Sequence, residues 1–172
     1  LIYNKNISVS PLTTHFPLKR IFKKITTKKI VSNIKTISNF YKKYIKRNVK
    51  FAITGLNPHC ESFEKYSEED KIIAPAIKIL KKANINISGP FPSDTIFLKN
   101  NLKNYDVVVG MYHDQVLAPM KTICGFDAIN ITLGLPFFRI TPDHGPNTSM
   151  VGKNKSNPKS LIRTIEFAKK IK

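Results

Sequence analysis

Short apolar runs alternate with longer segments of helical periodicity along this chain, and this alternation restricts its fold more than any other feature. The clearest run is residues 105–110 (YDVVVG), which predicts a buried strand. The clearest periodic segment is residues 25–45. Its apolar side chains recur at helical intervals, at Ile30, Ile34, Ile37, Tyr41 and Tyr44. Strands alternating with helices in this way predict an α/β fold.

The same patterns predict further elements. Strands are expected at residues 7–12, 49–55, 85–88, 128–132 and 137–141. Helices are expected at residues 67–82, where Ser67 to Asp70 supply capping and acidic side chains, and at residues 158–170, where Pro158 begins the helix. Pro75 is predicted to kink the first of these helices.

The length of 172 residues and the hydrophobic content of 41% suit one sizeable core. Domains usually contain about 100–200 residues, so residues 1–172 are expected to form a single α/β segment. No apolar run approaches the ~20 residues that a membrane-spanning helix needs, and the first residues lack the pattern of a signal peptide. A cytoplasmic protein without membrane contact is therefore expected.

The formal charge of +18 raises the possibility of nucleic-acid binding through phosphate contacts. The positive charge is nearly all lysine, with arginine only at Arg20, Arg47, Arg139 and Arg163. Specific nucleic-acid recognition more often uses arginine for base contacts and aromatic side chains for stacking. A solvated lysine-rich surface is the favoured interpretation, and a nucleic-acid-binding domain is kept as an alternative.

Three of the four histidines share one kind of setting. His15, His59 and His113 each lie in a turn-like stretch beside an apolar, strand-like run. Imidazole suits zinc and similar divalent ions, and three protein ligands leave a coordination position open for substrate or water. The histidines therefore indicate a metal site assembled from distant segments. The alternative for each is a surface histidine without a ligand role.

Several ordered motifs connect these histidines to a known family. Residues 111–115 (MYHDQ), then Pro119, Lys121 and Phe126, then residues 130–139 (NITLGLPFFR) and 143–145 (DHG) closely resemble the 4-hydroxythreonine-4-phosphate dehydrogenases of pyridoxal phosphate biosynthesis. Other signature stretches match in the same order, at residues 13–18 (TTHFPL), 55–59 (GLNPH) and 89–97 (GPFPSDTIF). The resemblance covers nearly the whole chain, yet only about the C-terminal half of the family's length.

This resemblance implies a fold, a reaction and a set of partners. The fold is the three-layer α/β/α architecture of isocitrate and isopropylmalate dehydrogenases, present here as a partial chain. The reaction is oxidation of 4-phosphooxy-threonine by NAD or NADP, followed by decarboxylation to 3-amino-2-oxopropyl phosphate. It requires one divalent metal ion, which is zinc, cobalt, manganese or magnesium. Family members are homodimers whose active site lies at the interface and takes metal ligands from both subunits.

The resemblance also implies a role for individual residues. The metal ligands are His15, His59 and His113. The phosphorylated substrate is bound by Lys121, Asn130 and Arg139, whose positive charges and directional amide suit phosphate and carboxylate groups. Asp114 is expected to orient a ligand histidine, although it could equally cap the following turn. Lys121 is also a possible proton acceptor.

A polar loop near the C-terminus is similar to the adenine-side cofactor loop of the isocitrate and isopropylmalate dehydrogenases. On this similarity, His144, Gly145 and Asn157 approach the NAD adenosine, and His144 is not a metal ligand. The chain departs from the family pattern at residues 60–67, where glycines are replaced. It departs again at Val116 and at Pro146, which lacks a backbone donor. A truncated or decayed homologue that folds and binds metal without catalysis is the main alternative to the enzyme.

Overall fold

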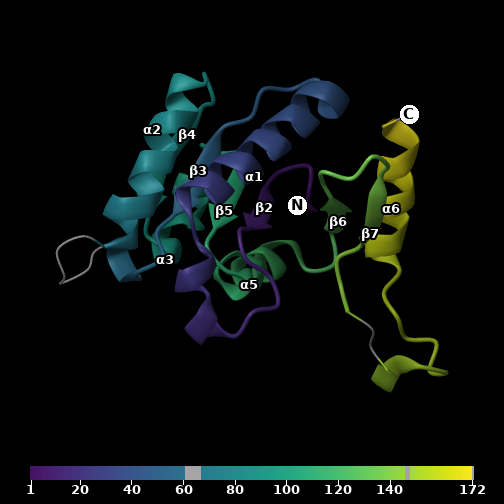
Figure 1. The fold of residues 1–172 in the computed structure, drawn as a ribbon. Coiled ribbons are helices and arrows are strands. Elements are labelled where there is room, and N and C mark those ends of the chain that lie inside the picture. The colour runs from purple at the N-terminus through teal and green to yellow at the C-terminus, as the bar shows by residue number, and fades with distance from the viewer. Residues whose placement is uncertain (61–66, 146–147, 172) are drawn as a thin grey trace.

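Seven strands form one mixed sheet in the computed structural model, which describes residues 1–60, 67–145 and 148–171 (Figure 1). The strands are β1 (Ile2–Tyr3), β2 (Ser8–Pro11), β3 (Phe51–Thr54), β4 (Ile87–Phe91), β5 (Val107–Gly110), β6 (Ile129–Thr132) and β7 (Arg139–Pro142). Their spatial order is β4-β3-β5-β2-β1-β6-β7. Neighbours among β4, β3, β5 and β2 are parallel, whereas the pairs β2–β1, β1–β6 and β6–β7 are antiparallel.

Six α-helices accompany these strands in the described part of the chain, and the last of them follows β7. They are α1 (Thr27–Phe40), α2 (Ala74–Lys82), α3 (Ser93–Ile96), α4 (Lys99–Leu102), α5 (His113–Cys124) and α6 (Lys159–Lys170). A π-helical turn at Tyr41–Ile45 continues α1, and another at Glu69–Ile73 precedes α2. None of the helices in the described residues is long and apolar enough to cross a membrane.

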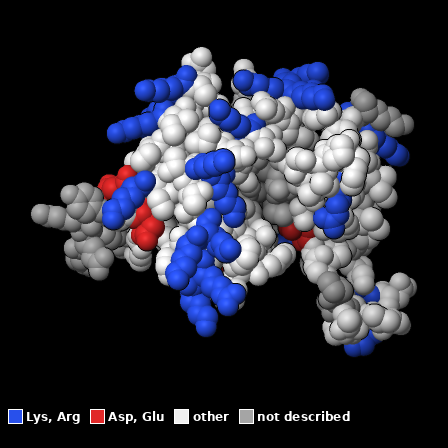
Figure 2. Space-filling view, in the orientation of Figure 1, with Lys and Arg blue, Asp and Glu red and all other residues white. Residues whose placement is uncertain are grey.

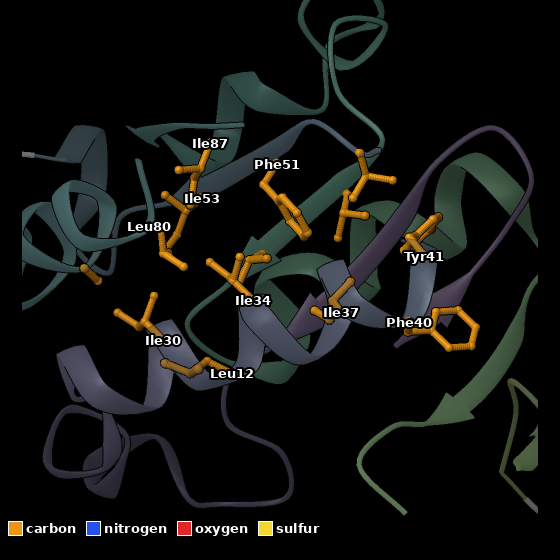
Figure 3. Packing of buried hydrophobic residues seen from close by; sticks show 14 of the residues in the cluster. Leu12, Ile30, Ile34, Ile37, Phe40, Tyr41, Phe51, Ile53, Leu80 and Ile87 are labelled. Atoms are coloured by element: carbon orange, nitrogen blue, oxygen red, sulfur yellow. The ribbon is translucent and has the colours of Figure 1, made fainter. Parts of the chain in front are cut away.

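The parallel strands bury side chains on both faces of the sheet. Phe51 and Val107 point into a large core that also contains the buried face of α1 (Figure 3). Ala52 and Val108, each one residue further along, point into a second core with Val116 of α5. Successive strand residues face opposite sides, so two cores require helices on both faces of the sheet. The predicted three-layer α/β/α fold is confirmed.

Most elements expected from the sequence are confirmed, with shifted ends. The segment 25–45 is α1 and its π-helical extension, and Thr26 caps it by accepting a hydrogen bond from the Lys29 N–H at 3.2 Å. The kink predicted at Pro75 stays a prediction, and the helix changes there from a π-helical turn to α2. Pro75 lies in the first turn of α2, directly after the π-helical turn, and supplies no N–H to that turn.

The expectation for His113 needs correction, because the sequence pattern placed it in a turn. The structure makes His113 the first residue of α5, a helix of 12 residues that the pattern did not predict. Pro119 lies inside this helix and obscures its signal, since proline usually ends a helical pattern. The histidine and the residues after it are therefore held by a helix, which is more rigid than a turn.

The side chain of Gln115 connects two strand ends at the edge of the sheet where β3 and β5 terminate. Its amide oxygen accepts hydrogen bonds from Thr54 Oγ1 at 2.9 Å and from Met111 N–H at 2.6 Å. Its amide nitrogen donates to the Gly55 carbonyl at 2.8 Å. Gln115 is buried, so this hydrogen-bonded network fixes the start of α5 against the end of β3.

A buried carboxylate organises the loop that follows β3. Glu69 Oε1 accepts hydrogen bonds from the backbone N–H groups of Leu56 at 2.7 Å and Asn57 at 2.9 Å, and Oε2 accepts from Asn57 Nδ2 at 2.8 Å. Burial opposes ionisation of Glu69, but these hydrogen bonds outweigh it and hold the pKa of the carboxyl below its ordinary value. The loop carrying His59 therefore depends on an ionised Glu69.

Val116, which departs from the family pattern, fits this fold. It is fully buried in α5 and packs over Gly110, where an added Cβ would lie 2.4 Å from Val116 Cγ1. The glycine at position 110 thus leaves space for the valine at position 116. The departures at residues 61–66 and at Pro146 lie outside the described residues.

Replacing Gly110 with alanine is expected to destabilise the fold by about 2 kcal/mol, because Val116 is β-branched, buried and unable to move away. Urea unfolding measures the loss. Adding Val116→Ala to Gly110→Ala should recover part of it, and Gly145→Ala, whose Cβ would meet nothing within 4 Å, is the control. Equal losses in Gly110→Ala and in the double variant would contradict the packing argument.

Replacing Glu69 with glutamine is expected to lower stability at neutral pH by about 1–2 kcal/mol, through loss of charge-assisted hydrogen bonds. Because the folded pKa of Glu69 is depressed, its contribution is present above the unfolded pKa and is lost as pH falls through the folded pKa. The variant should therefore lose less stability than the parent between neutral pH and about pH 3 in urea unfolding. The exposed Glu166→Gln is the control, and parallel pH profiles for parent and Glu69→Gln would contradict the assignment.

Candidate functional site

A cleft of about 660 Å³ contains most of the residues that the sequence marked for function. It lies where α1 and α5 approach the β6–β7 part of the sheet. Six predicted residues line it, from four segments of the chain: His15, His113, Lys121, Asn130, His144 and Gly145. The remaining four, His59, Asp114, Arg139 and Asn157, do not line the cleft and are described below.

Two of the predicted metal ligands meet at this cleft. The ring centroids of His15 and His113 are 5.7 Å apart, although the residues are far apart in the sequence. Their positions follow from the strand order, because β2 and β5 are parallel neighbours and His15 and His113 follow their carboxyl ends. Thr13 Oγ1 donates a hydrogen bond to the Met111 carbonyl at 2.7 Å and joins the two segments.

Asp114 lies in the position expected of a residue that orients a ligand histidine. Its Oδ1 is 2.7 Å from His113 Nδ1, outside the cleft lining. A carboxylate on Nδ1 favours the tautomer that carries a proton there, which leaves Nε2 with a free lone pair. Asp114 also lies in the first turn of α5, where a negative charge is favourable.

Lys121 is held by a carboxylate that the sequence patterns did not single out. Its Nζ lies 2.7 Å from Asp143 Oδ2 and also donates to the Asp143 carbonyl. Asp143 is buried, and its N–H donates to Ser160 Oγ at 2.9 Å. Ser160 in turn donates to the Ala128 carbonyl, so the start of α6 and β6 fix Asp143. The ammonium group of Lys121 is thus a positioned positive charge on the wall of the cleft.

Arg139 stands beside the cleft. Its Nη1 donates a hydrogen bond to Thr132 Oγ1 at 3.0 Å across the β6–β7 pair, and Thr132 lines the cleft near Asn130. The guanidinium is exposed and has further donors that this hydrogen bond does not use. Lys121, Asn130 and Arg139 therefore place two positive charges and an amide in one region.

The residues assigned to the cofactor divide into two groups. His144 and Gly145 line the cleft, and His144 Nδ1 lies 3.1 Å from the Gly145 carbonyl. Asn157 does not line it. Its Oδ1 accepts a hydrogen bond from the Lys159 N–H at 3.0 Å, at the beginning of α6. In this structure Asn157 organises a helix start, as asparagine often does.

His59 lies apart from the other two histidines. It is exposed in a 3₁₀ turn (Pro58–Cys60) and has a left-handed backbone with φ of 56°. Its Nδ1 is 3.8 Å from Asp94 Oδ2, because β3 and β4 are neighbours and both residues follow their ends. Within residues 1–60, 67–145 and 148–171, no group of three or more His, Cys, Asp or Glu is arranged to hold a metal ion. One chain thus supplies two of the three predicted ligands at the cleft.

Three residues that organise the site escaped the sequence analysis. Gln115 and Asp143 lie within motifs that were noticed for their histidines, but burial gives them their roles, and burial is not visible in a motif. Glu69 was noticed only as one of several acidic residues at a helix start. Glu69 accepts a hydrogen bond from the backbone of Asn57, 12 residues earlier in the chain, and this is a long-range contact. No local pattern reports such contacts.

Basic side chains lie over several elements on the face shown in Figure 2, with acidic side chains in smaller groups. The segment between His15 and α1 carries Lys19, Arg20, Lys23 and Lys24, all exposed. Lys24 Nζ lies 5.5 Å from the ring centroid of Phe16. This distribution agrees with a solvated basic surface, and the interpretation of the charge stays a prediction.

Comparisons with known proteins agree on one family. The chain is 44% identical over 166 residues to a 4-hydroxythreonine-4-phosphate dehydrogenase of Sulfurihydrogenibium. This alignment covers 95% of the chain and 51% of the relative. It is 31% identical to a D-threonate 4-phosphate dehydrogenase of Pectobacterium atrosepticum over 98% of this chain and 52% of the relative. A crystal structure of the 4-hydroxythreonine-4-phosphate dehydrogenase of Klebsiella pneumoniae matches with a TM-score of 0.82 and 31% identity, over 99% of this chain and 52% of that one.

The chain thus spans about half the length of the relatives it matches. The family model for the pyridoxal phosphate biosynthetic protein PdxA matches residues 1–168, which is almost the whole chain. The match to the Klebsiella pneumoniae structure leads to the same conclusion. This chain belongs to the PdxA family.

Proposed function

We propose that this chain is the C-terminal half of a metal-dependent dehydrogenase that uses NAD or NADP. It would oxidise 4-phosphooxy-threonine and yield 3-amino-2-oxopropyl phosphate after decarboxylation, in pyridoxal 5'-phosphate biosynthesis. The observation that supports this most is the meeting of His15 and His113 at a cleft that also contains Lys121 and Asn130. A protein that only served as a scaffold would not need the two histidines and the Asn130 amide beside the ammonium group of Lys121.

The cleft residues suit an anionic, phosphorylated substrate. Lys121 offers a positive charge that Asp143 holds in place, and Asn130 offers a directional donor and acceptor. Arg139 can bind a phosphate or carboxylate with two parallel hydrogen bonds. These groups would hold the substrate so that its secondary hydroxyl faces the histidines. The D-threonate 4-phosphate dehydrogenase is also named for a phosphorylated hydroxy acid, so related phosphorylated acids are the alternative substrates.

His15 and His113 fit a divalent metal ion by the chemistry of their donors. The Asp114 carboxylate on His113 Nδ1 leaves Nε2 free for a metal, as in many sites where a carboxylate supports a ligand histidine. A divalent ion bound there, such as zinc, cobalt, manganese or magnesium, would supply Lewis-acid stabilisation of negative charge on the reacting oxygen. The protein groups would orient the substrate, and Lys121 would exchange a proton with it.

A nicotinamide cofactor completes the proposed reaction. The nicotinamide of NAD or NADP would accept the hydride from the secondary alcohol. His144 and Gly145, which line the cleft, would contact the cofactor, and Asn157 would act by shaping the same loop. The oxidised substrate is a β-keto acid. It loses carbon dioxide readily, because the electrons of the broken bond delocalise into the ketone.

A second copy of the chain would complete the ligand set. His59 is exposed and away from the cleft, so it can serve a neighbouring subunit while His15 and His113 serve their own. This arrangement corresponds to a homodimer with its active site at the interface. A truncated homologue that folds and binds metal without catalysis is the second candidate.

An activity assay separates the two candidates. Reduction of NAD or NADP is followed with 4-phosphooxy-threonine and added zinc, cobalt, manganese or magnesium. The chain is compared with a restored form, in which the N-terminal half of the Sulfurihydrogenibium relative precedes Leu1. We expect turnover only in the restored form, because the chain provides the histidines and Lys121 but not the whole cleft. Bound metal without turnover in either form would favour the non-catalytic homologue.

Metal affinity tests the ligand set without activity. In the restored form, His113→Ala should abolish tight zinc binding in a competition titration with a chromophoric chelator. Asp114→Asn should weaken binding about 10–100-fold, because the supporting carboxylate is lost. His144→Ala is the matched control, since this histidine lines the same cleft and is assigned to the cofactor. Zinc affinity that survives His113→Ala would refute the assignment.

A further inference from the structure

Asp143 lies between two parts of the cleft that the proposed function assigns to different ligands. Its side chain contacts Lys121, which would bind the phosphorylated substrate. The next residues along the chain are His144 and Gly145, which would contact the cofactor, and all four residues line the same cleft. Residues 143–145, called the cofactor loop below, therefore reach the substrate-binding cation through the side chain of Asp143.

The contact between Asp143 and Lys121 holds both residues. Lys121 Nζ lies 2.7 Å from Asp143 Oδ2 and also donates a hydrogen bond to the Asp143 carbonyl. Oδ2 is shielded from solvent and accepts no hydrogen bond within the described residues, so the ammonium group of Lys121 compensates its charge. A buried carboxylate that lost this partner would be left uncompensated, which is costly. Lys121 and the cofactor loop are therefore expected to move together.

The anchor of Asp143 lies away from both proposed ligands. The Asp143 N–H donates to Ser160 Oγ at 2.9 Å, and Ser160 Oγ donates to the Ala128 carbonyl at 2.5 Å. Ser160 is fully buried and does not belong to the lining of the cleft. Because Ser160 holds the backbone of Asp143, a change at Ser160 would reach Lys121 through Asp143.

We propose that Asp143 is a positioning residue that couples the cofactor loop to Lys121. A cofactor bound to His144 and Gly145 fixes Asp143, which holds the Lys121 ammonium group where it binds a phosphate. By reciprocity, a phosphate on Lys121 strengthens cofactor binding by the same factor. The inference rests on the proposed function in assigning a nicotinamide dinucleotide to the cofactor loop and an anion to Lys121.

Binding measurements on the restored form test this coupling without turnover. NADH is titrated by its fluorescence with and without saturating inorganic phosphate, at equal ionic strength. In the parent, phosphate is expected to tighten NADH binding at least about fivefold, as in typical couplings between sites. Asp143→Asn, which keeps the shape of the side chain, should abolish this enhancement. Failure of NADH to bind the parent, or an NADH affinity that phosphate leaves unchanged or weakens, overturns the proposal.

Replacing Ser160 with alanine separates positioning from a merely structural role. Ser160→Ala should lower the phosphate enhancement at least about twofold and leave the NADH affinity without phosphate nearly unchanged. Thr164→Ala is the matched control, because Thr164 Oγ1 donates to the Ser160 carbonyl within the same helix, and it should keep the full enhancement. Parental enhancement in Asp143→Asn or in Ser160→Ala overturns the proposal. Coupling without turnover would contradict only the proposed activity, and turnover without coupling would contradict only this inference.

Discussion

The buried amide of Gln115 is the contact on which the arrangement of the cleft depends. It bonds to Thr54, Gly55 and Met111, and thereby fixes the end of β3, the end of β5 and the start of α5 to one another. His113 lies two residues before Gln115, so this network fixes the position of its backbone, while Asp114 contacts its ring. Thr13, which donates to the Met111 carbonyl, extends the same network to the His15 segment. All three hydrogen bonds of the Gln115 amide are buried, so breaking any one of them would leave a polar group unsatisfied in the interior.

Strand order explains why the histidines separate into two groups. All three follow carboxyl ends of parallel strands, and this regularity is visible in the sequence as an apolar run before each motif. The order β4-β3-β5-β2 places β5 beside both β2 and β3, but His59 turns toward Asp94 after β4. Its left-handed backbone and the Glu69 hydrogen bonds hold the loop in that direction. Sequence alone could predict that the histidines share an edge of the sheet, but not which of them meet.

The same distinction holds for the fold. Apolar runs such as residues 105–110 predict strands well, because three valines in sequence suit burial on both faces. The helix α5 was missed because Pro119 interrupts its pattern, while tertiary packing of Val116 and Met120 keeps it helical. The very short β1 has only two residues and no periodicity, yet it joins the parallel and antiparallel parts of the sheet. Motifs identified the candidate ligands His15 and His113, whereas Asp143 and Glu69 depend on contacts between distant segments.

The start of helix α6 connects the architecture to the proposed chemistry. The cleft takes its walls from α1, α5 and the β6–β7 region, and Asp143, which pairs with Lys121, is itself held by Ser160 at the start of α6. Ser160 also donates to the Ala128 carbonyl just before β6, so the position of Lys121 depends on the packing of α6 against β6 and β7. The positive charge that would bind the substrate is therefore fixed by the C-terminal helix, although Lys121 itself lies on α5.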